Sequence, residues 1–279
     1  MGDAETLPLA QPGVLARWLT TLRLAVRMTA FVLGTLLFRV GMEIDFLLRR
    51  KTRRIDLISK WTRRWAGGLL RVFGIRVEAH GPFADDGKLY PGRDDHGVGR
   101  IFVMNHRSGA DIPVMLTVAA VRVISRHDLA NWPLIGPGAK RIGTLFVDRT
   151  SRRSGATVLR QISDKLAAGE GIAMFPEGTA FPGDEIREFK PGAFNAAHRA
   201  GAQIVPMGVA YGDPAAYYTD DSFMAHMKRI AGLRGMRVVV EIGEPLVADE
   251  TSSVELKDQA REQVEQLVAK ARARLSAGG

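Results

Sequence analysis

The chain has 279 residues, 46% hydrophobic and 25% charged, so it can bury a full core as one domain with an appendage or as two small domains. It has no cysteine, which excludes disulfides, thiolate metal sites and cysteine nucleophiles. None of its six histidines forms a His-x3-His pair, so no helical zinc site is indicated and we expect no metal or other cofactor.

The net charge of +9 comes from the first 76 residues. They carry 14 Lys+Arg and 5 Asp+Glu, a difference of +9, whereas the rest of the chain carries 25 of each. A basic segment can bind nucleic acid or an anionic membrane surface, and the residues between the charges indicate which.

Residues 1–13 are mostly small and polar and predict a loose N-terminus. Residues 14–48 are apolar, but the longest uncharged run, Met28 to Phe38, is about half of the ~20 residues that a membrane-spanning helix needs. We therefore expect a helix that lies in the membrane interface or dips into one leaflet. The alternative is a buried helix of a soluble core. The charges that interrupt the segment are Arg17, Arg23, Arg27, Arg39, Glu43 and Asp45.

Residues 49–65 are strongly basic and place Ile55, Ile58, Trp61 and Trp65 at helical spacing. This composition is typical of an interfacial helix with tryptophans at headgroup depth and Lys/Arg meeting lipid phosphates. A nucleic-acid-binding helix or a solvated basic face are the alternatives, but the apolar stretch upstream has no role in nucleic-acid binding. Residues 14–74 are thus predicted to form a two-helix membrane-associating element, on an anionic membrane surface and without nucleic acid.

From residue 75 to 279, β-like runs alternate with helical patterns, which predicts an α/β domain. We expect a mixed, partly parallel sheet of about seven strands flanked by helices. The predicted strands are Ile75–Ala79, Arg100–Met104, Val121–Ser125, Leu145–Val147, Gly171–Phe175, Gln203–Ala210 and Arg237–Ile242. The predicted helices lie near 110–119, 132–140, 153–168, 190–200 and 252–275.

The run Ile101–Met104 leads into a histidine, His106, and an aspartate follows five residues later at Asp111. A strand, a turn and a helix that begins near Gly109 would bring the carboxylate to the imidazole, as a general base held by an acid requires. The alternative is that Asp111 caps the helix and His106 is an ordinary loop residue.

Three further stretches end or interrupt predicted strands. Gly143–Arg149 ends in an arginine, and Phe175–Thr179 leads a strand into a Pro-Glu-Gly-Thr turn whose backbone N–H groups could hold an anion or an oxyanion. Lys190 stands beside a predicted helix start, a place that suits a phosphate, although a solvated lysine is the default. Val205-Pro206 places a proline in a buried strand.

Together, these stretches resemble in order four motifs of the glycerolipid acyltransferases, which include the 1-acyl-sn-glycerol-3-phosphate acyltransferases. Asn105-His106-x-Ser108-x-x-Asp111 is similar to the first motif, Gly143 to Arg149 to the second, Phe175 to Thr179 to the third, and Val205-Pro206 to the fourth. The resemblance covers residues 75–245.

The resemblance implies transfer of an acyl group from acyl-CoA or acyl carrier protein to the hydroxyl of a membrane lipid. His106 would take the hydroxyl proton, Asp111 would fix the imidazole tautomer, and backbone N–H groups would hold the oxyanion. It also implies a peripheral or monotopic enzyme on the cytoplasmic face of the inner membrane. The substrate-binding residues implied are Asn105, Ser108, Arg126, Gly143, Arg149, Glu177, Gly178, Thr179 and Lys190.

One departure affects the acceptor. Relatives that use lysophosphatidic acid usually continue the third motif with arginine, and this chain has Ala180. Lys190, Arg149 and Arg126 are the candidates to replace its charge. The residues that follow Ala180 resemble the lyso-ornithine-lipid subgroup, which is therefore an alternative acceptor class. A non-catalytic membrane-binding or nucleic-acid-binding module on the same scaffold is a second alternative. A hydrolase is a third, but no Gly-x-Ser-x-Gly nucleophile motif supports it.

Overall fold

The structure is a computed structural model that describes residues 14–49, 53–148, 150–219, 222–247 and 252–277. At its centre is a seven-stranded sheet in the order β1-β7-β6-β2-β5-β3-β4. The predicted mixed α/β fold is confirmed, and each strand lies within about two residues of its predicted range. The strands are β1 (Ile75–His80), β2 (Ile101–Met104), β3 (Val121–Arg126), β4 (Leu145–Val147), β5 (Gly171–Met174), β6 (Ile204–Tyr211) and β7 (Met236–Ile242).

Five of these strands run parallel: β6, β2, β5, β3 and β4. Strand β7 pairs antiparallel with β6, and β1 pairs parallel with β7. The carboxyl ends of the five parallel strands therefore lie along one edge of the sheet. That edge is where loops of open α/β sheets form ligand sites.

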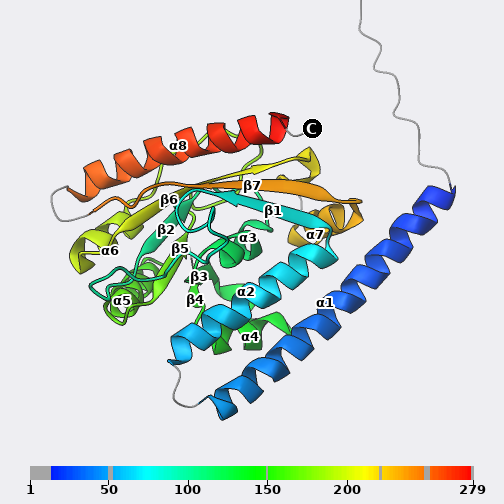
Figure 1. Ribbon diagram of the computed structural model, residues 1–279, viewed down its shortest axis with the longest axis horizontal. Coiled ribbons are helices and arrows are strands. Elements are labelled where there is room, and N and C mark those ends of the chain that lie inside the picture. Colours follow the sequence, from blue (N-terminus) through cyan, green and yellow to red (C-terminus); the bar gives the residue numbers. More distant parts are fainter. Residues whose placement is uncertain (1–13, 50–52, 149, 220–221, 248–251, 278–279) are drawn as a thin grey trace, which may run out of the picture.

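Alternating side chains of β2 divide the core into two layers. Phe102 and Met104 join the cluster formed with α2 (Arg54–Val72) and α3 (Asp111–Val118). Ile101 and Val103 face the opposite cluster, formed with α5 (Arg152–Ala167), α6 (Gly192–Ala200) and α8 (Ser253–Ala277). A strand buried on both faces reads as a continuous apolar run, which explains the four consecutive apolar residues. Figure 1 shows α8 on one side of the sheet and α2 on the other.

The structure adds elements that the sequence did not indicate. The main one is α7 (Phe223–Gly232), which begins where the Ser222 hydroxyl accepts a hydrogen bond from the backbone N–H of Ala225. Its apolar pattern is short and Met224 is exposed, so periodicity alone gave a weak signal. The 3-10 helices η1 (His127–Asn131) and η2 (Pro214–Ala216) were not predicted either. Helix α4 (Ile135–Arg141) corresponds to the helix predicted near 132–140.

Helix α1 (Val14–Leu48) is a single 35-residue helix that lies beside α2 (Figure 1). Several of its charged residues point toward the protein. The buried Arg27 donates to the backbone oxygens of Ala231 and Leu233 at the C-terminal end of α7, and Glu43 pairs with Arg141 of α4. Its apolar side chains point outward, and they make up fifteen of the nineteen large exposed apolar side chains among the described residues.

No helix in the described ranges combines the length and the continuous apolar character needed to cross a bilayer.

The predicted position of the two tryptophans of α2 at headgroup depth is wrong. Trp61 packs edge-on against Phe38 of α1 with ring centroids 5.8 Å apart, and its indole N–H donates to Asp45 at 3.0 Å. The indole N–H of Trp65 donates to the Thr35 hydroxyl at 3.1 Å. The tryptophans therefore join the two helices, because α1 supplies a closer apolar partner than a lipid surface would.

Candidate active site

The catalytic candidates lie on the loop between β2 and α3, at the carboxyl edge of the parallel strands. Strand β2 ends at Met104, and α3 begins at Asp111. The loop turns tightly enough that the Asp111 carboxylate accepts hydrogen bonds from the backbone N–H groups of Arg107 and Ser108, at 2.7 and 2.8 Å. Asp111 thus fixes the shape of the loop that carries His106.

The structure brings His106 and Asp111 together as the sequence predicted. His106 Nδ1 lies 2.7 Å from Asp111 Oδ2. Asp111 is fully buried, whereas the His106 side chain is 17% exposed. Because the carboxylate accepts the proton of Nδ1, the other ring nitrogen, Nε2, carries a lone pair. The imidazole ring stacks on Phe175 with centroids 4.4 Å apart, which restricts its rotation. The pair can therefore act as an oriented general base.

A tyrosine that the sequence analysis missed completes the surroundings of Asp111. The Tyr211 hydroxyl, at the end of β6, donates to Asp111 Oδ1. Burial, followed by the nearby Asp111 charge, raises the pKa of Tyr211 well above its usual value, so the hydroxyl stays a proton donor. The two residues are 100 positions apart in the chain, and only the pairing of β6 with β2 brings them together.

Glu177 is buried and holds the His106 loop from the neighbouring strand end. Its carboxylate accepts from the backbone N–H of His106 at 2.8 Å and of Arg187 at 3.1 Å. It also pairs with the guanidinium of Arg107 at 2.9 Å, and both side chains are fully buried. Glu177 is thus a positioning residue in this structure, and the expectation that it lines the acceptor site is corrected. Arg107 is a second residue that the sequence analysis passed over.

Asn105 and Ser108 are also fully buried, so neither side chain faces an open site. The Asn105 side chain makes two hydrogen bonds with the backbone of Val209. Its amide N–H donates to the Val209 carbonyl at 2.9 Å, and its amide oxygen accepts from the Val209 N–H at 2.8 Å. The Ser108 hydroxyl accepts from the backbone N–H of Ala110 at 3.1 Å. Both side chains shape the turn. Their further assignment as substrate-binding residues is corrected.

The Pro-Glu-Gly-Thr turn and Lys190 lie side by side, although 11 residues separate Lys190 from Thr179. Gly178 has φ of +83°, which favours glycine, and a Cβ there would lie 2.4 Å from Lys190 Nζ, so the lysine side chain lies against this turn. Thr179 and Lys190 are exposed. The backbone N–H of Phe181 donates to the His106 carbonyl at 3.1 Å, which seats this turn against the His106 loop.

The remaining substrate-binding candidates are Arg126, Gly143 and Arg149, and the two that the structure describes lie at opposite edges of the sheet. Arg126 ends β3 at the same edge, but its guanidinium makes two hydrogen bonds to Asp128, at 3.0 and 2.7 Å. Gly143 precedes β4, so it lies at the opposite edge, where a Cβ would approach Lys165 and Arg122. The expectation that Gly143 helps to bind substrate near His106 is therefore corrected. Arg149 lies outside the described residues.

Helix α7 also reaches the site. The backbone N–H of Gly109 donates to the ring of the buried His226 at 2.9 Å, and the Arg107 carbonyl accepts from the N–H of Tyr218 at 2.7 Å. The segment that contains α7 thus supports the outer side of the His106 loop. The only sequence signal for it was its likeness to the lyso-ornithine-lipid subgroup.

Comparison with known proteins agrees with this geometry. Residues 92–210, which include the His106 loop, the Pro-Glu-Gly-Thr turn and most of β6, match the family model described as Acyltransferase. The chain is 29% identical over 256 residues to the lyso-ornithine lipid O-acyltransferase of Pseudomonas aeruginosa, covering 87% of this chain and 92% of that protein. It is 28% identical over 184 residues to the 1-acyl-sn-glycerol-3-phosphate acyltransferase of Neisseria gonorrhoeae, covering 63% of this chain and 71% of that protein.

Among solved structures, the fold resembles the 1-acyl-sn-glycerophosphate acyltransferase of Thermotoga maritima. The TM-score is 0.69 with 22% sequence identity, and the match covers 93% of this chain and 97% of that chain. At this level of identity the likeness concerns the fold, which includes the N-terminal helices because so much of both chains is covered.

Proposed function

We propose that this chain is an acyltransferase that transfers a fatty acyl chain from a thioester donor to the free hydroxyl of a lysophospholipid in phospholipid biosynthesis. The donor is acyl-CoA or acyl carrier protein, and the acceptor is a membrane lipid. The observation that carries the proposal is the contact of His106 with the buried Asp111 at 2.7 Å.

The chemistry follows from that contact. His106 Nε2 removes the proton of the acceptor hydroxyl while its oxygen attacks the thioester carbonyl. Asp111 stabilises the imidazolium that forms and keeps the ring in the productive tautomer. When the tetrahedral intermediate collapses, the C–S bond breaks and the leaving thiolate takes the proton from His106. The products are an ester and a thiol, and the enzyme regains its starting state without a covalent intermediate.

The outward apolar face of α1 supports membrane association. Leu33, Leu36, Leu37 and Val40 are all between 45% and 72% exposed, although burying one such side chain contributes about 1.5–3 kcal/mol. An apolar strip of this length on a protein surface marks a contact with lipid or protein. We propose that α1 lies in the membrane interface, so that the enzyme is peripheral or monotopic on the cytoplasmic face of the inner membrane.

A lyso-ornithine lipid is the second candidate acceptor, and the residues near His106 favour it. Ala180 brings no cation to the Pro-Glu-Gly-Thr turn, and the guanidinium of Arg126 is already bound to Asp128. Of the cations proposed for an acceptor phosphate, the described residues leave Lys190 exposed beside Gly178. An acceptor without a phosphomonoester needs fewer cations than lysophosphatidic acid does.

An acceptor panel tests the proposal. The purified protein in liposomes receives one acyl-CoA, or one acyl carrier protein thioester, with lysophosphatidic acid, lyso-ornithine lipid or lysophosphatidylcholine. We expect acylation of at least one acceptor and a loss of more than about 100-fold in His106→Ala, the usual scale for a general base. His198→Ala is the matched control, because that histidine is exposed on α6. The proposal is wrong if no acceptor reacts, or if His106→Ala keeps the wild-type rate.

A further inference from the structure

A second concave region lies beside α2. It is a cavity of about 1120 Å³ between α2, β1, the loop of residues 84–93 and the last turn of α3. We call it the basic cavity. No residue of the His106 loop lines it, and Asp111 does not line it either. Its wall includes Thr117 and Val118, at the other end of α3 from Asp111. Since a helix rises 1.5 Å per residue, these ends are about 10 Å apart.

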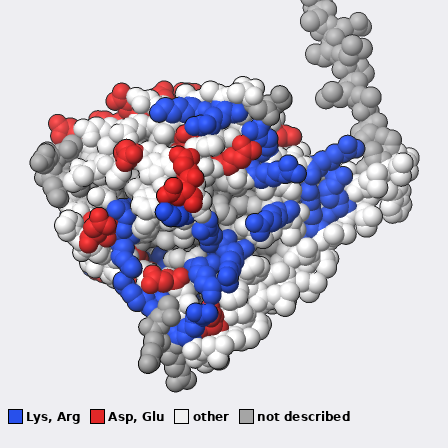
Figure 2. All heavy atoms as spheres, in the orientation of Figure 1, with Lys and Arg blue, Asp and Glu red and all other residues white. Residues whose placement is uncertain are grey.

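Eight lysines and arginines line the basic cavity, against the single carboxylate of Asp56. Figure 2 shows basic side chains gathered around a hollow along α2. Four of the eight have a carboxylate within 4 Å: Lys60 with Asp45, Lys88 with Asp86, Arg93 with Asp56, and Arg122 with Glu170. The other four form no ion pair with any described carboxylate, and they are Arg63, Arg64, Arg71 and Arg76.

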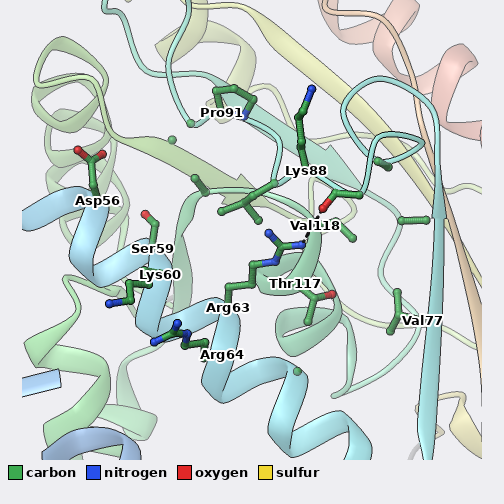
Figure 3. Close-up of a pocket in the computed structure, with 18 of the residues that line it drawn as sticks. Asp56, Ser59, Lys60, Arg63, Arg64, Val77, Lys88, Pro91, Thr117 and Val118 are labelled. Carbon is green, nitrogen blue, oxygen red and sulfur yellow. Dashed lines mark hydrogen bonds between the residues drawn. The ribbon is translucent and has the colours of Figure 1, made fainter. Parts of the chain in front are cut away.

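The cavity that these four guanidiniums line also has apolar walls. Leu70, Ile75 and Val77 contribute to the wall of the basic cavity. Figure 3 shows Arg63 extending from α2 across the cavity toward the loop that carries Lys88, and its guanidinium donates to the Gly87 carbonyl at 3.4 Å. At Gly67, on the cavity side of α2, a Cβ would have no atom within 4 Å. The space is therefore open rather than filled by side chains.

This combination selects a class of ligand. Arginines without carboxylate partners bind phosphate through paired N–H donors, and one phosphate cannot balance four of them. The concave shape fits a discrete molecule or headgroup, and its volume of about 1120 Å³ lies slightly above the ~300–1,000 Å³ of typical ligand pockets. We propose that the basic cavity binds a ligand that carries two or more phosphate groups on a partly apolar body. Such a ligand would contact α2 and the last turn of α3.

Two sources supply this chemistry, a soluble nucleotide and a phospholipid headgroup, and a binding experiment distinguishes them. The full chain is titrated with ADP, and separately with phosphatidylcholine vesicles with and without cardiolipin, a lipid with two phosphates. No acyl donor or acceptor is present, so the result is independent of the acyltransferase reaction. We expect binding of ADP, or a preference for cardiolipin vesicles over pure phosphatidylcholine, and in either case weaker binding at higher salt.

A substitution inside the open space makes the experiment specific. Gly67→Glu places a carboxylate in the basic cavity without a steric clash, and replacing glycine within a helix favours folding. We expect it to weaken binding about tenfold or more, because the introduced carboxylate repels the phosphates of the ligand. Gly67→Gln controls for size. Gly155→Glu repeats the charge change on α5, where a Cβ also has no atom within 4 Å.

The expected result is that Gly155→Glu binds within about twofold of wild type and Gly67→Gln binds more tightly than Gly67→Glu. The proposal is overturned if neither ADP nor cardiolipin binds, or if Gly67→Glu binds as well as Gly155→Glu.

Discussion

The His106 loop and the basic cavity use charge in opposite ways. Around the His106 loop, Asp111, Glu177 and Arg107 are buried, and each makes hydrogen bonds within the protein. In the basic cavity, four arginines of the lining form no ion pair with any carboxylate of the described residues. Buried charges are retained only when they are paired, whereas unpaired charges at an open surface are tolerated because water solvates them. The first region is thus organised before substrate arrives, and the second is left for a ligand to complete.

The largest effect should come from removing the charge that orients His106. Asp111→Asn keeps the size of the side chain but removes the negative charge that faces His106 and the backbone N–H groups of Arg107 and Ser108. We expect acyl transfer to fall by about 10²–10⁴-fold, the range for general acid–base catalysis. Steady-state kinetics measure it, with circular dichroism to establish folding. A folded variant with near-wild-type kcat would show that Asp111 only caps α3.

The second effect concerns stability. Glu177→Ala leaves the Arg107 charge buried without its partner, so we expect a loss of about 3–5 kcal/mol in the free energy of unfolding. Urea denaturation measures it. The matched control is Glu78→Ala, which removes a half-exposed pair with Arg237 and should cost less than about 1 kcal/mol. Equal losses in the two variants would contradict the contrast between buried and open charges.

A smaller effect tests Tyr211 as a positioning residue. Tyr211→Phe removes one hydrogen bond that holds the Asp111 carboxylate in place. We expect kcat to fall about tenfold, since a hydrogen bond to a charged group contributes roughly 1.5–3 kcal/mol and a freer carboxylate orients His106 less well. The KM for the acceptor should stay within about twofold, because the hydroxyl contacts Asp111 and not the substrate.

The control for this variant is Tyr217→Phe, which changes a hydroxyl bonded to Asp184 and Arg272. It should leave kcat within about twofold of wild type. If both variants lower kcat equally, or if Tyr211→Phe raises KM as much as it lowers kcat, then Tyr211 has a packing role only.

The smallest effect is expected in the basic cavity. Replacing Arg64 and Arg71 together by Gln removes two exposed charges that form no ion pair with a described carboxylate. We expect the free energy of unfolding to change by less than about 0.5 kcal/mol, as is usual for surface substitutions. Urea denaturation checks it beside Glu177→Ala. A loss of several kcal/mol in the free energy of unfolding would mean that these arginines stabilise the fold and are not reserved for binding a ligand.

The fold could be predicted to a large extent because its strands are short apolar runs bounded by turns. Each of the seven runs became a strand, since a strand buried on both faces tolerates few polar residues. Helix α7 was not predicted because it is short and its apolar pattern covers few residues. The position of Trp61 and Trp65 was predicted wrongly because an amphipathic pattern shows which face is buried and not what buries it.

Within the site, the sequence by itself determined the contact of His106 with Asp111, because both residues belong to one strand–turn–helix segment whose geometry is local. Only the tertiary structure decided that the Tyr211 hydroxyl donates to Asp111 and that Glu177 binds Arg107 and the His106 loop. It also decided that Gly143 lies at the opposite edge of the sheet. It also gathered arginines of α2 and β1 around one cavity. These outcomes depend on which strands pair and which helices pack, and no local pattern in the chain encodes those long-range contacts.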